Sequence, residues 1–282
     1  MEDNNINTEK LQWGKTVWKL FSQVRLQSPL IQCITNFVSM DLMANTLLSA
    51  GASPAMVHSI EEIPDFTPRV SALCINVGTL SPSSLPAMIT AAKICSQLNI
   101  PWVLDPVAVS ASSFRFDACV QLVCLKPTVI RGNASEIIAL AYSSSSSRSS
   151  ATKGADSTHD SMDAIEAAKF LAQASGAIVA VSGATDIVTD GKRVVGAHNG
   201  VALLQKITAT GCSVTALIAA FVAVDKSNAL DAAVSALAVF GLAGELGMKM
   251  AKGPASLRMH LIDALYGLDE ATLQSHVNIT SL

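Results

Sequence analysis

Residues 207–213 place two threonines, a glycine, a cysteine and a serine directly before a long apolar run. We expect this run to form a helix, whose first turn leaves backbone N–H groups unpaired at the positive end of the helix dipole. Such a terminus binds phosphate-like anions, so Gly211, Cys212 and Ser213 form a candidate anion hole. The same position favours a thiolate, which makes Cys212 a candidate reactive group. In the structural alternative, Gly211 turns the chain, Thr210 caps the helix and Cys212 packs in the core.

Asp105 follows an apolar strand predicted over residues 102–104. Ligands of open α/β sheets bind at the carboxyl ends of the strands, where an aspartate is well placed to hold a metal ion or its water. An aspartate ahead of a proline is also common in turns, so Asp105 taken alone favours a structural role.

A second polar cluster, Arg131-Gly-Asn-Ala-Ser-Glu136, follows a strand predicted over residues 128–130. Arg131 has the planar donor geometry that clamps phosphate. A capping box would account for Asn133 and Glu136 without any function. Asp105 and Glu136 are 31 residues apart, about one βαβ unit, so we expect them on neighbouring strands at one edge of the sheet. Two carboxylates beside an arginine indicate Mg²⁺ and a polyphosphate.

The three clusters together favour phosphoryl transfer. The sequence contains no G-x-x-x-x-G-K-[ST] motif, which excludes a P-loop enzyme, and no G-x-G-x-x-G after a predicted strand, which argues against a Rossmann dehydrogenase.

Strands and helices alternate along the chain, which predicts βαβ units and a mostly parallel sheet covered on both faces. Strands are predicted at residues 29–34, 53–57, 72–77, 102–104, 128–130 and 177–181, with a hairpin at 186–195. Helices are predicted at residues 11–26, 41–50, 83–98, 116–122, 134–142 and from 213 onward. The polar, Ser-rich stretch at about 143–160 is interpreted as a flexible surface insertion within a single domain spanning residues 1–282.

The amino-acid composition and net charge exclude some classes of protein. Hydrophobic residues make up 50% of the 282, aromatic residues only 5%, and the mean hydropathy is +0.42. We interpret this excess of small apolar residues as tight packing and oligomerisation. The longest charge-free run that could mimic a membrane span, residues 207–224, is too polar to cross a membrane. A net charge of −3 offers no basic surface for nucleic acid. The polar N-terminus resembles no targeting segment, which makes the cytoplasm the default compartment.

The six cysteines include no C-x-x-C pair, which argues against structural zinc. Cys74 and Cys124 lie in apolar runs and are interpreted as core thiols of a reducing compartment.

The clusters resemble those of a known family. Residues 131–136 resemble the N-x-x-E magnesium motif of ribokinase-like kinases, and the Ala-Thr-Gly-Cys segment ending at Cys212 resembles their anion-hole motif, with cysteine where sugar kinases have an aspartate base. Four further segments, Cys33-Ile-Thr-Asn36, Gly51-Ala-Ser-Pro-Ala-Met56, Asn76-Val-Gly-Thr79 and Leu104-Asp-Pro-Val-Ala108, extend the resemblance to the hydroxyethylthiazole kinases over roughly residues 15–270.

This resemblance implies a three-layer α/β/α sandwich with a mostly parallel central sheet. It also implies a homotrimer, with active sites at subunit interfaces, that uses ATP and Mg²⁺ to phosphorylate the alcohol of 4-methyl-5-(2-hydroxyethyl)thiazole for thiamine synthesis. Residue matching gives each group a role: Cys212 beside the accepting hydroxyl, Met56 and Asn36 on the thiazole, Arg131 and Ser182 on ATP, and Asp105 and Glu136 on Mg²⁺.

Two positions depart from the family pattern. Ala209 stands where the family usually has a glycine whose backbone approaches the substrate, and alanine restricts positive φ. Ser182 stands where threonine is frequent, but the hydroxyl is kept. Two other functions stay open: another ribokinase-like alcohol kinase, such as one for a hydroxymethylpyrimidine, and a non-catalytic ligand-binding relative.

Overall fold

The computed structural model of the protein describes residues 2–142 and 160–282. Within them a nine-stranded sheet has the order β2-β1-β3-β4-β5-β6-β7-β8-β9. The strands are β1 (Leu30–Ile34), β2 (Ser53–Ala55), β3 (Ala72–Asn76), β4 (Trp102–Asp105), β5 (Val129–Asn133), β6 (Ile178–Ser182), β7 (Asp186–Thr189), β8 (Val194–Ala197) and β9 (Ile279–Ser281). The first six strands are parallel and the last three continue the sheet in antiparallel order, which confirms the mostly parallel sheet and the hairpin.

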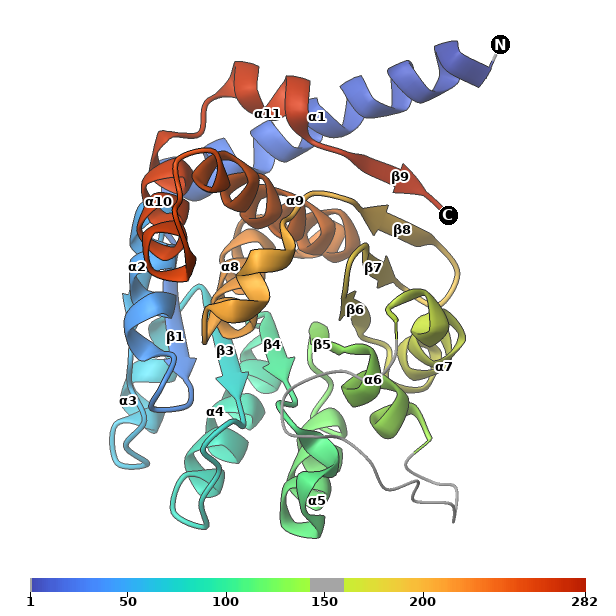
Figure 1. Cartoon of the computed structure of the whole chain (residues 1–282). Helices are drawn as coiled ribbons and strands as arrows, with labels where there is room; N and C mark the ends of the chain where they lie inside the picture. The colour runs from blue at the N-terminus through green and yellow to red at the C-terminus, as the bar shows by residue number, and fades with distance from the viewer. Residues whose placement is uncertain (1, 143–159) are drawn as a thin grey trace.

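Helices cover both faces of this sheet (Figure 1). One face packs against α4 (Leu85–Leu98), α5 (Ser113–Val123), α6 (Ala134–Ala141) and α7 (Ile165–Ser175). The other packs against α1 (Glu2–Gln27), α2 (Met40–Ala50), α8 (Thr210–Val224) and α9 (Ala229–Met248). The short α3 (Ile63–Phe66) follows β2, and α10 (Pro254–Gly267) and α11 (Glu270–His276) precede β9. The three layers confirm the expected α/β/α sandwich.

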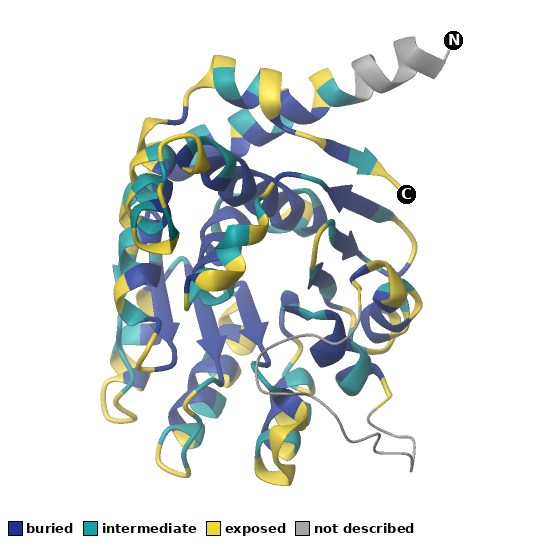
Figure 2. Ribbon diagram, viewed as in Figure 1, coloured by how far each residue is buried: buried dark blue, intermediate teal, exposed yellow. Residues whose placement is uncertain are grey.

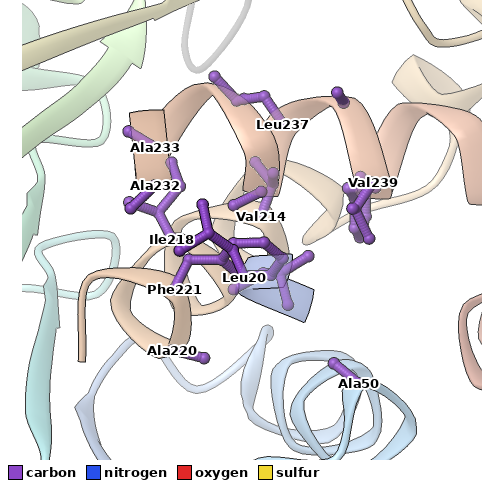
Figure 3. Packing of buried hydrophobic residues seen from close by; sticks show 14 of the residues in the cluster. Leu20, Ala50, Val214, Ile218, Ala220, Phe221, Ala232, Ala233, Leu237 and Val239 are labelled. Carbon is purple, nitrogen blue, oxygen red and sulfur yellow. The ribbon is translucent and has the colours of Figure 1, made fainter. Parts of the chain in front are cut away.

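Helices α8 and α9 form the centre of the larger hydrophobic core, and Figure 2 shows them largely buried. Alanines on both helices let them approach closely, and Figure 3 shows Ile218 and Phe221 of α8 beside Ala232 and Ala233 of α9. The segment Lys226–Met248 is long and apolar enough to cross a membrane, but 78% of its apolar 18-residue stretch is buried inside the protein. We therefore interpret α9 as a core helix.

Several boundaries differ from the predictions. α8 begins at Thr210 instead of 213, and β5 continues to Asn133, because its backbone pairs with β6 as far as Asn133↔Ser182. β2 ends at Ala55, two residues early. Cys124 is exposed at the end of α5, so its prediction as a core thiol was wrong, although Cys74 is buried as expected. The Ser-rich stretch lies outside the described residues, apart from Asp160.

Candidate active site

Adjacent parallel strands deliver one polar side chain each to the same edge of the sheet. Asn76 and Asp105 are the last residues of β3 and β4 and pair in register. Ser182 ends β6 opposite Asn133 of β5. Asn36 follows β1 by two residues, and the strand order β1-β3-β4-β5-β6 therefore sets these groups in a row along the carboxyl edge. The predicted neighbouring positions of Asp105 and Glu136 are confirmed, because β4 pairs with β5 and Glu136 lies in the first turn after β5.

The amide of Asn36 connects β1 with the start of α8. Its Oδ1 accepts hydrogen bonds from the backbone N–H of Val38 (3.1 Å) and of Ser39 (3.0 Å), so Nδ2 faces the opposite way. Nδ2 donates to Asn76 Oδ1 at 2.8 Å and to Cys212 Sγ at 3.4 Å. The predicted substrate contact and the predicted catalytic thiol are thus direct neighbours.

Asn76 continues this row to Asp105. Its Oδ1 also accepts from the backbone N–H of Gly78 at 2.9 Å, so its Nδ2 donates to Asp105 Oδ2 at 2.7 Å. Thr215 of α8 donates to the same carboxylate oxygen at 2.9 Å. Asp105 Oδ1 is buried without a hydrogen-bond partner among the described residues, which leaves one carboxylate oxygen available to a ligand.

Glu136 is held by two backbone groups. Asn133 N–H donates to Oε2 at 2.8 Å and Ala108 N–H to Oε1 at 2.7 Å. The first bond completes a capping box with the Asn133 side chain, so the structural interpretation of this pair holds as well. Burial, followed by the charge of Asp105, raises the pKa of Glu136 to about 7. Burial also raises the pKa of Asp105, against the charge of Arg131.

Two carboxylates suit a cation whose other ligands are water molecules and substrate oxygens. No group of three or more His, Cys, Asp or Glu side chains that could hold a metal ion occurs in the described parts of the chain. Mg²⁺ commonly uses one or two carboxylates, with waters and substrate phosphates completing the shell. The unpartnered Oδ1 of Asp105 is the carboxylate oxygen of this site that a cation can bind.

Arg131 links the carboxylates to β6 and to α8. Its Nε donates to Ser182 Oγ at 2.8 Å, and its Nη1 lies 3.9 Å from Asp105 Oδ2. A Cβ on Gly211 would lie 2.8 Å from Arg131 Nη1, so only glycine lets the guanidinium rest on the first turn of α8. The structure therefore brings together the two residues expected to contact ATP.

The start of α8 differs in detail from the prediction. The N-cap is Ala209, at φ +69°, and Thr210 does not cap the helix, because its hydroxyl donates to the carbonyls of Leu204 and Ile207. Ser213 N–H donates to Ala209 O at 2.9 Å, which removes it from the expected anion hole. Gly211 and Cys212 precede that bond, and their N–H groups point out of the helix end.

Cys212 is half-buried in this first turn. Burial and the charge of Asp105 raise the pKa of its thiol to about 11, although the hydrogen bond from Asn36 and the charge of Arg131 lower it. Burial therefore opposes the thiolate that the helix terminus would favour.

Met56 lies just beyond β2 and packs, partly buried, against the larger core. Sequence reasoning missed the roles of Thr215 and Ala108, and it gave Asn76 only as part of a family segment. A hollow of about 310 Å³ between α9, α10 and α11 is lined by Leu246, Met250, Leu268 and other mostly apolar side chains. It contains none of the site residues, so we place the site at the strand ends.

Comparison with known proteins agrees with this geometry. Residues 21–271 match the hydroxyethylthiazole kinase family. The chain is 67% identical to a hydroxyethylthiazole kinase of Arabidopsis thaliana, with 98% of each chain covered. It is 46% identical to one from Rhizobium leguminosarum, over 96% of this chain and all of the relative.

Solved structures give the same result. A hydroxyethylthiazole kinase protein from Pyrococcus horikoshii superposes with a TM-score of 0.87 at 35% identity, covering 95% of this chain and 99% of that one. A pyridoxal kinase from Staphylococcus aureus, bound to ADP, superposes with a TM-score of 0.61 at 15% identity, covering 90% and 98%. At that identity the second likeness concerns the fold alone.

Proposed function

Because this chain belongs to the hydroxyethylthiazole kinase family, we propose that it transfers the γ-phosphate of ATP to the primary alcohol of 4-methyl-5-(2-hydroxyethyl)thiazole, a salvage step toward thiamine diphosphate. The observation that carries the proposal is the continuous contact of Cys212, Asn36, Asn76, Asp105 and Arg131. This contact joins a thiol proposed to bind the hydroxyl, a carboxylate, and a guanidinium proposed to bind phosphate, next to the first turn of α8.

Phosphoryl transfer needs positioning and charge stabilisation more than proton removal, because its transition state is loose. The substrate hydroxyl is proposed to lie beside Cys212, where a neutral thiol and the Asn36 amide orient it. The N–H groups of Gly211 and Cys212 stabilise the charge that develops on the transferring group. Met56 and the backbone at Ala209 complete the thiazole site.

The nucleotide is proposed to lie across β5 and β6. Arg131 and Ser182 contact its phosphates, and the 2.8 Å bond between them fixes the guanidinium before ATP binds. Asp105 and Glu136 hold Mg²⁺, with the unpartnered Oδ1 of Asp105 as the available oxygen. When bound, the metal ion neutralises charge on the phosphates.

We also propose a homotrimer with active sites at subunit interfaces, in the cytoplasm. Phe37 and Val38, next to Asn36, are 75% and 63% exposed, which is unusual for large apolar side chains beside a small-molecule site. All six thiols are free, as a reducing compartment would keep them.

The direct test is phosphorylation of the thiazole alcohol by purified protein with Mg-ATP, followed by mass spectrometry of the product. A hydroxymethylpyrimidine alcohol and pyridoxal serve as parallel substrates, and an Asp105→Asn variant serves as the control for contaminating kinases. The expected result is thiazole phosphate from the wild type alone. Turnover of another alcohol in preference to the thiazole would assign a different ribokinase-like activity. Saturable binding with no transfer to any alcohol would indicate a non-catalytic relative.

A further inference from the structure

The imidazole of His58 joins the segment after β1 to the segment after β2. The backbone N–H of Thr35 donates to His58 Nε2 at 3.0 Å, and His58 Nδ1 lies 3.1 Å from the carbonyl oxygen of Met56. An amide N–H can only donate, so Nε2 is the unprotonated nitrogen and Nδ1 carries the hydrogen. The two contacts therefore select one neutral tautomer, which donates to Met56 and accepts from Thr35.

This link lies where regular pairing of the sheet stops. β2 is the edge strand and pairs with β1 only as far as Gln32↔Ala55. Thr35 is the first residue after β1 and Met56 the first after β2. Beyond the last pair, side chains replace the backbone ladder: Gln32 Nε2 donates to the carbonyl of Val57 at 3.2 Å, and His58 makes the two bonds above.

The two ends of the link lead to the two residues, Asn36 and Met56, that are assigned to the thiazole. Asn36 follows Thr35 and donates to Cys212, so the Thr35 end leads to the group beside the accepting hydroxyl. The other end is Met56, assigned to the thiazole ring. A change in the His58 contacts would alter the separation of these two groups without touching Arg131, Ser182 or the carboxylates.

We propose that His58 is a positioning residue for the thiazole: it fixes Met56 at the correct distance from the Asn36–Cys212 pair and so controls substrate binding more than phosphoryl transfer. The inference rests on the proposed function, since that assigns the thiazole to Met56. Of the two contacts made by the imidazole, the one at Nε2 is essential, because it is the contact that joins His58 to the segment after β1.

Four variants test this. His58→Ala removes both contacts. His58→Gln keeps an acceptor at the distance of Nε2 from the backbone, and His58→Asn keeps only a donor at the distance of Nδ1. Ser71→Ala is the matched control, because Ser71 Oγ accepts from Leu30 N–H at 3.2 Å, the same kind of bond at the opposite end of β1.

We expect His58→Ala to raise the KM for the thiazole about tenfold, the effect of losing one or two ordinary hydrogen bonds. The kcat and the KM for ATP should change less than about twofold, the pattern of lost ground-state binding. His58→Gln should stay within about threefold of the wild-type KM and His58→Asn should resemble His58→Ala. An equal rise in Ser71→Ala, or no rise in His58→Ala, would overturn the proposal.

A second readout does not depend on turnover. With methyl-labelled methionine, and Met56→Leu to assign the signal, the Met56 resonance of the ligand-free protein should shift in His58→Ala and return in His58→Gln. Ser71→Ala should leave it unchanged. A wild type that phosphorylates no thiazole refutes the proposed function, whereas an unmoved Met56 signal in His58→Ala refutes the positioning role.

Discussion

Cys212 is protonated at neutral pH, because its thiol has a pKa of about 11 in a half-buried position beside Asp105. A neutral thiol is a weak hydrogen-bond acceptor and a poor base for an alcohol. We propose that it orients the substrate hydroxyl, and that the remaining stabilisation comes from the helix terminus and Arg131.

This role of Cys212 predicts an order of activities among variants. Cys212→Asp should keep or raise kcat for thiazole phosphorylation, because a buried carboxylate with a raised pKa binds a hydroxyl more strongly. Cys212→Ala should lower kcat about tenfold, equivalent to about 1.4 kcal/mol. Steady-state kinetics with intact folding, checked by circular dichroism, measure both. Near-normal kinetics in Cys212→Ala would mean that the thiol only packs, and a folded, ATP-binding Cys212→Asp without turnover would contradict the orienting role.

The guanidinium of Arg131 contacts both Ser182 and the first turn of α8. Arg131→Ala should raise the KM for ATP roughly tenfold to a hundredfold, because a charge-assisted hydrogen bond is worth about 1.5–3 kcal/mol. The KM of Arg131→Lys for ATP should lie between those of the wild type and Arg131→Ala, because lysine provides the charge without the planar guanidinium. The KM for the thiazole is the internal control and should change little.

The raised pKa of Glu136 predicts that the unfolding free energy falls as the pH rises. Its pKa is about 7 in the folded protein and 4.5 ordinarily, so the folded state binds more protons between these values. Raising the pH across this window should therefore lower the unfolding free energy by about 3 kcal/mol through Glu136. Urea titrations of metal-free protein should show this loss, and Glu136→Gln should remove it. Parallel pH curves for the two proteins would show that Glu136 titrates normally.

At the scale of elements, the start of α8 depends on a backbone conformation that alanine adopts at a cost. Ala209 has φ +69°, in the left-handed region that costs an L-residue about 1–2 kcal/mol. In this conformation Ser213 N–H donates to Ala209 O, and Gly211 and Cys212 form the first turn beside Arg131 and Asn36.

Ala209→Gly should relieve that strain. We expect the unfolding free energy to rise by up to about 1 kcal/mol, after the greater entropy of glycine in the unfolded chain is deducted. Gly51→Ala is the opposite control: Gly51 ends α2 at φ +92°, and a Cβ there would lie 2.9 Å from Arg25 Cγ, so stability should fall. Denaturant melts measure both, and a destabilised Ala209→Gly would contradict the strain argument.

Elements and site were predictable from sequence to different extents. Hydrophobic runs located each parallel strand within one to three residues. The spacing of Asp105 and Glu136 correctly placed them at the same edge of the sheet, although Glu136 lies in the first turn of α6 and not on β5 itself. The end of β5 was missed, because Arg131 and Asn133 are polar and their pairing with β6 is not visible in local composition. Thr215 was missed because its bond to Asp105 joins residues 110 positions apart, and only packing of α8 on the sheet creates it.

At the scale of the whole molecule, the site rests on a core of small residues and a few aromatic rings. Phe221 of α8 stacks on Phe21 of α1 with ring centroids 6.2 Å apart, and both are fully buried. The same helix presents Cys212 and Thr215 at its other end, so the position of the site depends on this packing.

Phe221→Ala should cost about 3–5 kcal/mol of unfolding free energy, because it removes a buried ring and leaves a cavity. Phe221→Leu should cost much less. The KM for ATP should be unchanged in folded protein of either variant, since Arg131 and Ser182 lie on the sheet. Calorimetric melts and nucleotide titrations measure the two effects, and a loss of less than 1 kcal/mol in Phe221→Ala would show that the core repacks around the gap.

The two hydrogen-bonded amides of Asn36 and Asn76, which connect Cys212 with Asp105, have a consequence for proton transfer. Backbone N–H groups fix the orientation of both amides, so Asn36 Nδ2 donates to Cys212 and to Asn76 Oδ1, and Asn76 Nδ2 donates to Asp105. Amide groups do not exchange protons readily near neutral pH, so the row transmits position and electric field but conducts no protons. In the proposed reaction we therefore expect the proton of the substrate alcohol to leave on a phosphate oxygen or through water, so that Asp105 is left to bind a cation.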